Sequence, residues 1–222
     1  MTLRINSTAP NFTAQTTHGL IDFHEWFENQ WVILFSHPKD FTPVCTTELG
    51  YMAKIESEFT KRNTKLIALS IDSVEDHNKW LKDIEQTQGA KVNYPIIADT
   101  NLLISKLYNM LPAEEETGTL QNRTPASNAT VRSVFIFSPD KRIQLMLTYP
   151  MTTGRNFDEI LRAIDSMQLT AKHKVATPAN WQPGQDVIIS NSVSDAQAKE
   201  LYPEGWNAPC SYLRFVKQPA PL

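Results

Sequence analysis

Apolar runs and stretches of helical periodicity alternate along the chain up to about residue 170. A short apolar run bounded by polar residues is typical of a buried strand, and apolar residues at roughly every third or fourth position indicate an amphipathic helix. Strands are expected at residues 31–36, 65–72, 94–98, 132–137 and 143–149, and helices at 42–62, 73–87, 101–108 and 156–168. This alternation predicts strand–helix–strand crossovers, and therefore an α/β fold with a mixed sheet and helices outside it.

The segment after residue 170 has a different character. Prolines interrupt it at positions 178, 183, 203, 209, 219 and 221, between short apolar pieces such as residues 186–189. Too little apolar sequence remains for a core of its own, so we expect this segment to pack on another surface. The chain is therefore predicted to consist of a domain at residues 1–169 and an extension at 170–222. A long loop is expected at 111–129, which is rich in turn-forming residues.

Cys45 stands at the predicted start of the helix at 42–62. Thr42 is a good N-cap residue, and Pro43 suits the first helical position, because its missing N–H would have no partner there. Cys45 is then the third helical residue, where unpaired backbone N–H groups and the positive end of the helix dipole stabilise a thiolate. The alternative is an inert cysteine buried in the core, the usual position of a free cysteine.

The composition favours an intracellular protein without a nucleic-acid or membrane partner. The 222 residues carry a net charge of −3, so no basic surface for nucleic acid is expected. No apolar run reaches the roughly 18 residues of a membrane span, and the first residues lack the apolar core of a secretory signal. Two cysteines do not make a disulfide framework, which favours a reducing compartment and a cytoplasmic location.

The residues around Cys45 resemble a known family. Pro38-x-x-x-Thr42-x-x-Cys45 is similar to the active-site signature of the peroxiredoxins, thiol peroxidases that reduce hydroperoxides. Longer strings resemble the one-cysteine, peroxiredoxin-six-like subfamily, and they stand at residues 35–38, 40–49, 66–72 and 152–160. The likeness extends from residue 9 to residue 214. It implies a thioredoxin-like mixed sheet flanked by helices, no cofactor, and a C-terminal extension that forms a homodimer or a larger oligomer.

The resemblance also implies the reaction. Hydrogen peroxide or an organic hydroperoxide would oxidise Cys45 to a sulfenic acid, and an external thiol, glutathione or a thioredoxin-like donor, would reduce it again. Arg132 matches the arginine that holds the thiolate and polarises the substrate, since its guanidinium offers several donors at once. Thr42 is expected to place its hydroxyl near the sulfur and the peroxide, instead of capping the helix or as well. Donors aimed at the departing oxygen lower the barrier.

Four further residues fall on motif positions. Glu48 and Arg155 are expected to hold Arg132 in place, because an unpaired carboxylate near the thiolate would raise the thiol pKa. Pro38 is part of the signature. His37 matches the active-site histidine of the subfamily, which would donate to the substrate or tune the thiolate. A second interpretation of His37, as a hydrogen-bonded histidine at a strand end, stays open.

The remaining histidines predict no further site. They show no metal-ligand spacing with either cysteine, so no metal is expected, and they are His18, His24, His77 and His173. Some members of the subfamily are also phospholipases, but the position of their serine reads Glu28-Asn29-Gln30-Trp31-Val32 here. Without a hydroxyl nucleophile no acyl-enzyme can form, so lipid hydrolysis is rejected.

The sequence leaves three alternatives to the one-cysteine peroxidase. A thioredoxin-like disulfide oxidoreductase needs a Cys-x-x-Cys pair, and Thr42 occupies the position three before Cys45. A two-cysteine peroxidase would use Cys210 as its resolving cysteine. The arms of such enzymes carry Val-Cys-Pro, whereas here Pro209 precedes the cysteine and Ser211 follows it. Cys210 is therefore expected to be a packed or surface cysteine. A non-catalytic holdase or scaffold is the third alternative, and the sequence does not exclude it.

Overall fold

The computed structural model describes residues 3–113 and 128–220. They belong to two compact units, Met1–Arg155 and Asn156–Leu222. Most of the predicted loop at 111–129 lies outside the described residues. Among the described residues, none of the helices has the length and apolar character that crossing a membrane requires.

A seven-stranded mixed sheet is the centre of the first unit, in the order β2-β1-β5-β4-β3-β6-β7. Its strands are β1 (Thr13–Thr16), β2 (Gly19–Asp22), β3 (Trp31–Ser36), β4 (Thr64–Ser70), β5 (Ile96–Ala98), β6 (Arg132–Phe137) and β7 (Ile143–Tyr149). Strands β3, β4 and β5 are parallel, and β6 runs antiparallel to both β3 and β7. This is the predicted mixed sheet, and its central strands are those expected from the apolar runs.

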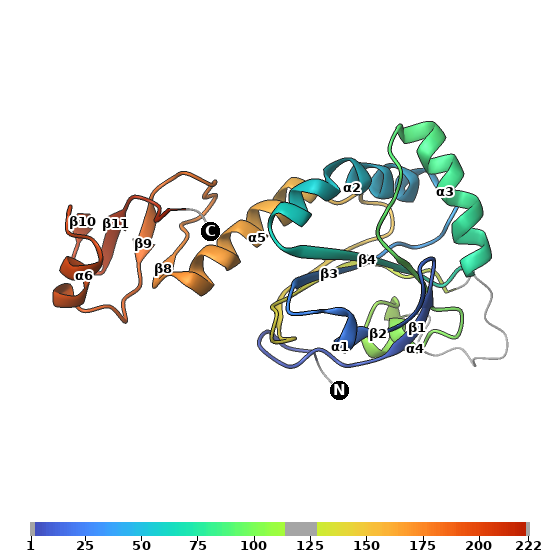
Figure 1. The fold of residues 1–222 in the computed structure, drawn as a ribbon, viewed down its shortest axis with the longest axis horizontal. Helices are drawn as coiled ribbons and strands as arrows, with labels where there is room; N and C mark the ends of the chain where they lie inside the picture. Colours follow the sequence, from blue (N-terminus) through green and yellow to red (C-terminus); the bar gives the residue numbers. More distant parts are fainter. Residues whose placement is uncertain (1–2, 114–127, 221–222) are drawn as a thin grey trace. The chain divides into compact units, whose positions relative to one another are not determined.

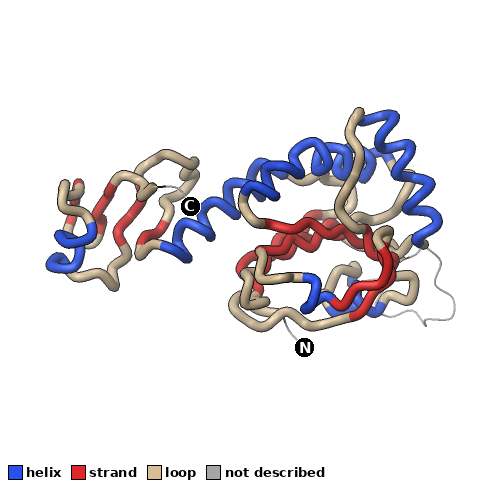
Figure 2. The backbone as a smooth tube through the Cα atoms, in the orientation of Figure 1, coloured by secondary structure: helices blue, strands red, loops and turns tan. Residues whose placement is uncertain are grey.

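Helices cover both faces of this sheet (Figures 1 and 2). They are α1 (Phe23–Trp26), α2 (Pro43–Lys61), α3 (Val74–Gln88) and α4 (Leu103–Leu107). Helices α2 and α3 lie on one side of the sheet, and α1 and α4 lie on the other. All six residues of β3 are buried, as expected for a strand with both faces covered. The start of α2 thereby follows the end of a completely buried strand.

The predicted and observed elements differ mainly at their ends. Strand β5 begins at Ile96 rather than at residue 94, because Pro95 has no N–H to donate to a neighbouring strand. Strand β4 ends at Ser70 rather than at residue 72. The β1–β2 hairpin was not predicted, because β1 reads Thr-Ala-Gln-Thr and carries little apolar signal.

The second unit comprises one long helix and a small sheet. Its elements are α5 (Phe157–Lys172), β8 (Val175–Ala176), β9 (Val187–Ile189), α6 (Asp195–Leu201), β10 (Asn207–Cys210) and β11 (Leu213–Val216). The four strands are antiparallel in the order β10-β11-β9-β8. The compact units divide before α5, and the predicted division into domains 1–169 and 170–222 stays a prediction.

The second unit has a small core of its own, so the expectation of a segment without one was wrong. Trp181 is 1% exposed and packs with Leu169, Val175 and Val187. Its indole N–H donates to the carbonyl of Gln185 at 3.0 Å, which satisfies the only polar atom of that side chain. A count of apolar residues underestimates this core, because one large aromatic side chain, that of Trp181, fills much of its volume.

Gly50 is the position where α2 and α3 approach most tightly among the described glycines. A Cβ atom at Gly50 would lie 2.3 Å from Gln88 Cγ and 2.5 Å from Gln88 Cβ. Alanine is favoured over glycine in a helix by about 1 kcal/mol. Overpacking of this kind costs about 1–3 kcal/mol. We expect the steric cost to prevail, so Gly50→Ala should lower the free energy of unfolding.

Urea unfolding of Gly50→Ala, Gln88→Gly and the double variant tests this expectation as a double-mutant cycle. In the Gln88→Gly background the opposing Cβ is gone, so Gly50→Ala should become neutral or stabilising. A single Gly50→Ala variant that is more stable than the parent protein would contradict the expected packing.

Candidate active site

The first turn of α2 begins directly after a loop that follows β3. Thr42 is the N-cap residue with extended backbone (φ −118°, ψ 148°), and Pro43 occupies the first helical position as predicted. The Thr42 hydroxyl does not cap the helix, however. It donates to the carbonyl of Lys39 at 2.8 Å, back into the loop. Of the two roles left open for the Thr42 hydroxyl, side-chain capping is absent, and the predicted position of the helix start is confirmed.

Cys45 is the third residue of α2 and is completely buried. Arg132 Nη1 donates to the Cys45 sulfur at 3.4 Å. Arg132 is the first residue of β6, and β6 runs antiparallel to β3. The first residue of β6 therefore lies beside the end of β3, where α2 begins. The sheet topology in this way brings the predicted arginine to the predicted cysteine.

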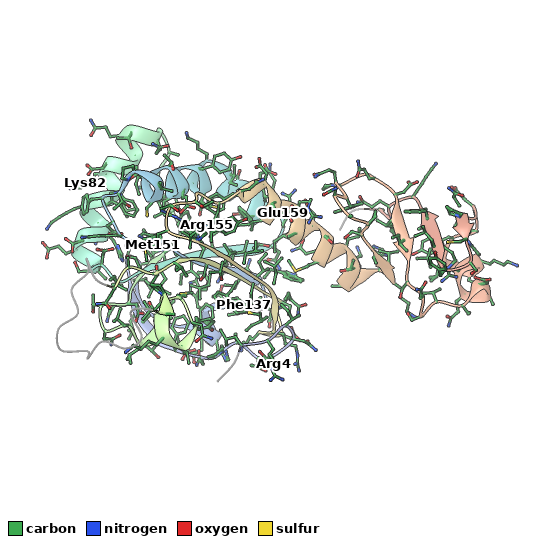
Figure 3. The ribbon with its side chains drawn as sticks, turned by 180° about the vertical axis from the view of Figure 1, so that it is seen from behind. Arg4, Lys82, Phe137, Met151, Arg155 and Glu159 are labelled. Carbon is green, nitrogen blue, oxygen red and sulfur yellow. The ribbon has the colours of Figure 1, made fainter. Side chains whose placement is uncertain are left out.

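Glu48 lies one turn after Cys45 and accepts hydrogen bonds from two buried arginines. Arg132 Nη1 and Arg155 Nη2 both donate to Oε2 at 2.7 Å. The backbone N–H and Nε of Arg155 both donate to Oε1 at 2.9 Å. The predicted pairing of Glu48 with arginine is thus present. Figure 3 shows Arg155 between the sheet and α2.

Backbone carbonyls accept further hydrogen bonds from the two guanidinium groups. Arg155 Nη1 donates to the carbonyls of Ser36 at 2.8 Å and Ser133 at 3.0 Å. Arg132 Nε donates to the carbonyl of Met151 at 2.8 Å. These bonds fix both planar groups, so the guanidinium of Arg132 is held in one orientation toward the sulfur.

The charges of this cluster leave one positive charge beside Cys45. Burial raises the pKa of Glu48, but the charge and hydrogen bonds of Arg155 and the charge of Arg132 outweigh burial and lower that pKa. Glu48 is therefore a carboxylate at neutral pH, and two guanidinium charges face one carboxylate. A thiolate on Cys45, 3.4 Å from Arg132, would complete the charge balance. Such a setting favours a nucleophilic sulfur.

His37 belongs to a second buried network on the other side of the loop. His37 and His77 are fully buried, and Asp40 is 2% exposed. Asp40 Oδ1 lies 2.7 Å from His37 Nε2, and Asp40 Oδ2 lies 2.6 Å from His77 Nδ1. Pro38, which follows His37, is buried as well. Neither Asp40 nor His77 was among the predicted site residues.

The same region contains a group of potential metal ligands in His37, Asp40 and Asp72, whose atoms lie within 4.8 Å of one another. Both oxygens of Asp40 already accept hydrogen bonds from histidines. Asp72 Oδ2 accepts from the backbone N–H of Asp40 and from the hydroxyl of Ser70. Three of the carboxylate oxygens of this group are therefore engaged with donors, and this part of the described structure is a hydrogen-bond network. The predicted absence of a metal stays a prediction.

Two family models match the chain, the AhpC/TSA family over residues 5–146 and the C-terminal domain of 1-Cys peroxiredoxin over residues 166–205. The chain is 49% identical to a 1-Cys peroxiredoxin of Dictyostelium discoideum, over 98% of this chain and 86% of that protein. It is 50% identical to peroxiredoxin-6 of Rattus norvegicus, over 98% of each chain. The chain belongs to the 1-Cys peroxiredoxins.

The solved structure of a yeast mitochondrial 1-Cys peroxiredoxin describes thiol resolution through glutathione and thioredoxin systems. It has a TM-score of 0.89 and 50% sequence identity, and it covers 97% of this chain and 100% of its own. The predicted family, the thioredoxin-like fold with a C-terminal extension, and the activity of a thiol-regenerated peroxidase are confirmed. The disulfide oxidoreductase and the two-cysteine peroxidase are less well supported.

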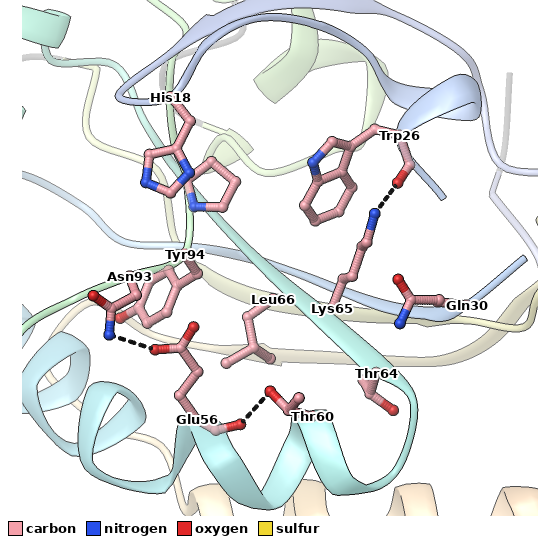
Figure 4. Close-up of a pocket in the computed structure, with 11 residues that line it drawn as sticks. His18, Trp26, Gln30, Glu56, Thr60, Thr64, Lys65, Leu66, Asn93 and Tyr94 are labelled. Carbon is pink, nitrogen blue, oxygen red and sulfur yellow. Dashed lines mark hydrogen bonds between the residues drawn. The ribbon is translucent and has the colours of Figure 1, made fainter. Parts of the chain in front are cut away.

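A separate pocket of this peroxiredoxin lies away from Cys45 and has a volume of about 340 Å³ (Figure 4). None of the predicted site residues lines it. Its lysine, Lys65, donates to the carbonyl of Trp26 at 2.8 Å and pairs with Glu28 at 2.6 Å. Asn93 donates to Glu56 at 3.4 Å. The lysine and the asparagine of this pocket therefore already have hydrogen-bond partners within the protein.

Neutralising the buried carboxylate of Glu48 should lower the free energy of unfolding substantially. Glu48→Gln leaves two buried guanidinium groups without their counter-charge, and breaking a buried ion pair from one side costs about 3–5 kcal/mol. Glu58 on the same helix is a matched control, since it also pairs with two cations, Lys61 and Arg62, but is 39% exposed. Urea unfolding should show a large loss for Glu48→Gln and a much smaller one for Glu58→Gln.

The stability that Glu48→Gln loses should depend on pH in one direction. The folded-state pKa of Glu48 lies below the ordinary value of 4.5, so its stabilisation is complete above that value and disappears as the pH falls through the folded pKa. The gap between the parent protein and Glu48→Gln should therefore narrow in acid. A gap that stays constant from neutral pH to the acid limit of folding would contradict this assignment.

Proposed function

We propose that Cys45 is the peroxidatic residue of this peroxiredoxin and that Arg132 activates both the sulfur and the substrate. The observation that carries the proposal is the 3.4 Å contact between Arg132 Nη1 and the Cys45 sulfur at the buried start of α2. The thiolate attacks the terminal oxygen of the hydroperoxide. The S–O bond forms as the O–O bond breaks, the sulfur is oxidised to sulfenic acid, and the departing oxygen takes up a proton as water or an alcohol.

The neighbouring residues support this step in different ways. Arg132 stabilises the negative charge that moves from sulfur to the departing oxygen, as a preorganised donor does. The Thr42 hydroxyl donates to Lys39, which leaves its oxygen able to accept a hydrogen bond from the incoming hydroperoxide. Glu48 and Arg155 hold the guanidinium of Arg132 in its orientation. His37 lies in the loop that precedes α2, and Pro38 restricts the backbone of that loop.

The sulfenic acid requires an external reductant in this proposal. A first thiol forms a mixed disulfide with Cys45 and releases water, and a second thiol releases Cys45 and leaves as a disulfide. Glutathione or a thioredoxin-like donor is the proposed thiol. The support is the yeast relative, whose structure describes thiol resolution by both systems and is 50% identical to this chain.

The assembly and location are also proposals. We propose a homodimer formed through the C-terminal extension, which matches the C-terminal domain of 1-Cys peroxiredoxins at residues 166–205. Two large apolar side chains of the second unit are exposed in the single chain, Leu201 at 53% and Tyr212 at 71%, and suit a protein surface. Two free cysteines fit a reducing compartment, and the cytoplasm is the proposed one.

Substitutions of the two arginines should differ in their effects: one should mainly slow the oxidation of Cys45, and the other should mainly lower the stability of the fold. Arg132→Met removes the donor to sulfur and substrate, so the second-order rate of Cys45 oxidation should fall by about 10²–10³-fold. Arg155→Met should cost less rate, because Arg155 acts through Glu48, but more stability, because its hydrogen bonds to Ser36 and Ser133 are lost as well. Stopped-flow oxidation of the reduced enzyme and thermal unfolding measure the two effects. A near-parental rate in a folded Arg132→Met enzyme would contradict the assignment.

Only one of the two cysteines should be required for peroxide turnover. Cys45→Ser should abolish hydroperoxide turnover in a folded protein, which also separates a peroxidase from a holdase. Cys210 is half-buried in β10, and Cys210→Ser should keep full turnover with a small thiol as reductant. Non-reducing gels after one equivalent of peroxide should show no crosslink between the two cysteines. A stoichiometric disulfide dimer that vanishes in Cys210→Ser would overturn the one-cysteine mechanism.

A further inference from the structure

Helix α3 turns a buried face toward the rest of the first unit, and Trp80 lies on that face. The buried residues of α3 are His77, Trp80 and Ile84, which share one side of the helix. Trp80 is only 1% exposed, although tryptophan is rarely buried so completely. Helices α2 and α3 lie on the same side of the sheet (Figure 1), and the absence of a side chain at Gly50 lets Gln88 of α3 approach α2 closely.

The indole of Trp80 begins a short chain of hydrogen bonds that leads to the N-cap of α2. Its Nε1–H donates at 3.2 Å to the hydroxyl oxygen of Thr46, the residue after Cys45. The Thr46 hydroxyl donates at 2.8 Å to the carbonyl of Thr42. The backbone N–H of Thr46 donates to the same carbonyl at 3.0 Å. These three hydrogen bonds connect α3 to the first turn of α2.

The direction of this chain follows from the chemistry of its groups. An indole N–H only donates a hydrogen bond, and a backbone carbonyl only accepts one. A hydroxyl has a single proton, so the Thr46 hydroxyl accepts from Trp80 and uses its proton toward Thr42. The donor from Trp80 thus removes the rotational freedom of the Thr46 hydroxyl and directs its proton to the carbonyl of Thr42.

The residue before Thr42 has an unusual backbone conformation. Phe41 has a φ of 57°, in the left-handed region, which is an outlier for a bulky residue. Such a conformation persists only where the surrounding structure holds it, and it is concentrated at functional sites. The ring of Phe41 is 52% exposed, and its centroid lies 6.3 Å from that of Trp80. Trp80 therefore supports the chain on both sides of Thr42, through its ring at Phe41 and through its N–H at Thr46.

These contacts meet the proposed reaction at Thr42. The Thr42 hydroxyl donates to Lys39 at 2.8 Å, and its oxygen is the proposed acceptor for the hydrogen of the incoming hydroperoxide. The carbonyl of Thr42 receives both donors from Thr46. A rotation of this residue would displace its hydroxyl relative to Cys45, which follows in the same turn. A displacement of about 1 Å in a reacting group can cost about 10²-fold in rate.

We propose that Trp80 is a positioning residue for the peroxidase reaction, and that it acts through Thr46 to fix Thr42 beside Cys45. This inference rests on the proposed function of Cys45. The indole N–H is the first donor of the chain, and the chain ends at the residue that receives the hydroperoxide. The effect of Trp80 therefore falls on the oxidation of Cys45 by the hydroperoxide and not on its later reduction by a thiol.

The first test is a double-mutant cycle on the second-order rate of Cys45 oxidation by hydrogen peroxide. Rapid quench and labelling of Cys45 follow this step without a tryptophan signal. Trp80→Phe keeps an aromatic ring but removes the N–H, and should slow the step about three- to tenfold, as the loss of one hydrogen bond does. Thr46→Val removes the acceptor and should slow it by a similar factor. In the Thr46→Val background, Trp80→Phe should have no further effect, and an equal loss in both backgrounds would overturn the proposal.

Thr46→Ser is the conservative variant of the cycle, because it keeps the hydroxyl that links Trp80 to Thr42. It should restore a near-parental rate of Cys45 oxidation where Thr46→Val does not. A parental rate in Thr46→Val, or a loss in Thr46→Ser as large as in Thr46→Val, would contradict the chain. Both variants retain Trp80 and change a side chain that is only partly buried, so they decide the question even where Trp80→Phe does not fold.

Trp181→Phe is the matched control for the loss of a buried indole N–H. Trp181 is also 1% exposed, and its N–H donates to the carbonyl of Gln185 at 3.0 Å in the second unit. Thermal unfolding should show a loss of stability in Trp181→Phe and in Trp80→Phe. Only Trp80→Phe should slow the oxidation of Cys45. Equal slowing in both variants would show that the rate follows stability alone and would refute a positioning role.

The indole N–H resonance of Trp80 is a direct readout of the first hydrogen bond. The chain has five tryptophans, and the signal of Trp80 is the one that Trp80→Phe removes. In the reduced enzyme, Thr46→Val should displace this proton–nitrogen signal and accelerate its exchange with solvent, while the signal of Trp181 should stay in place. A Trp80 signal that Thr46→Val leaves unmoved would show that the bond to Thr46 is not made in solution, and the proposal would fail.

Two kinds of failure can be told apart by these measurements. A parent enzyme in which Cys45→Ser leaves turnover unchanged would defeat the proposed function itself. An active parent enzyme whose Trp80→Phe and Thr46→Val variants are oxidised at the parental rate would defeat only the role of Trp80.

Discussion

The proposed active site depends on one carboxylate, that of Glu48, shared by the guanidinium groups of Arg132 and Arg155. All three side chains are almost completely buried. Charges in such a place interact strongly with one another and are costly when unpaired. The cluster also connects distant parts of the first unit, because Glu48 comes from α2, Arg132 from β6, and Arg155 binds the carbonyl at the end of β3. The contact between Arg132 and the Cys45 sulfur therefore depends on the packing of the core.

The same cluster makes a buried carboxylate compatible with the thiolate that we propose at Cys45. A single glutamate one turn after Cys45 would oppose negative charge on sulfur. With two arginines beside the one glutamate, the net charge of these three side chains is positive. The N-terminal turn of α2 adds a partial positive charge of its own. The protein thus assembles a net cationic environment in which one guanidinium faces the sulfur at 3.4 Å and the other is occupied by carboxylate and backbone.

A second buried network, with histidines in place of arginines, involves the same loop. There a carboxylate is held between two histidines, and α3 supplies both the distant histidine and the indole that contacts Thr46. The parallel order of β3, β4 and β5 makes this possible, because the segments that leave the carboxyl ends of β3 and β4 emerge at the same edge of the sheet. The loop after β3 therefore lies between a network rich in arginine and a network rich in histidine.

The sequence by itself determined the local features of this protein: the buried strand at 31–36, the start of α2 at Pro43 and the third helical position of Cys45. These follow from periodicity and helix-end preferences, which act over a few residues. The resemblance to the peroxiredoxin family added Arg132, Glu48 and Arg155 to the predicted site residues. Only the tertiary structure decided that the Thr42 hydroxyl turns toward Lys39, that the second unit has its own core around Trp181, and that His77 reaches Asp40. The last contact spans 37 residues, and its existence depends on how strands pair and helices pack rather than on any local pattern.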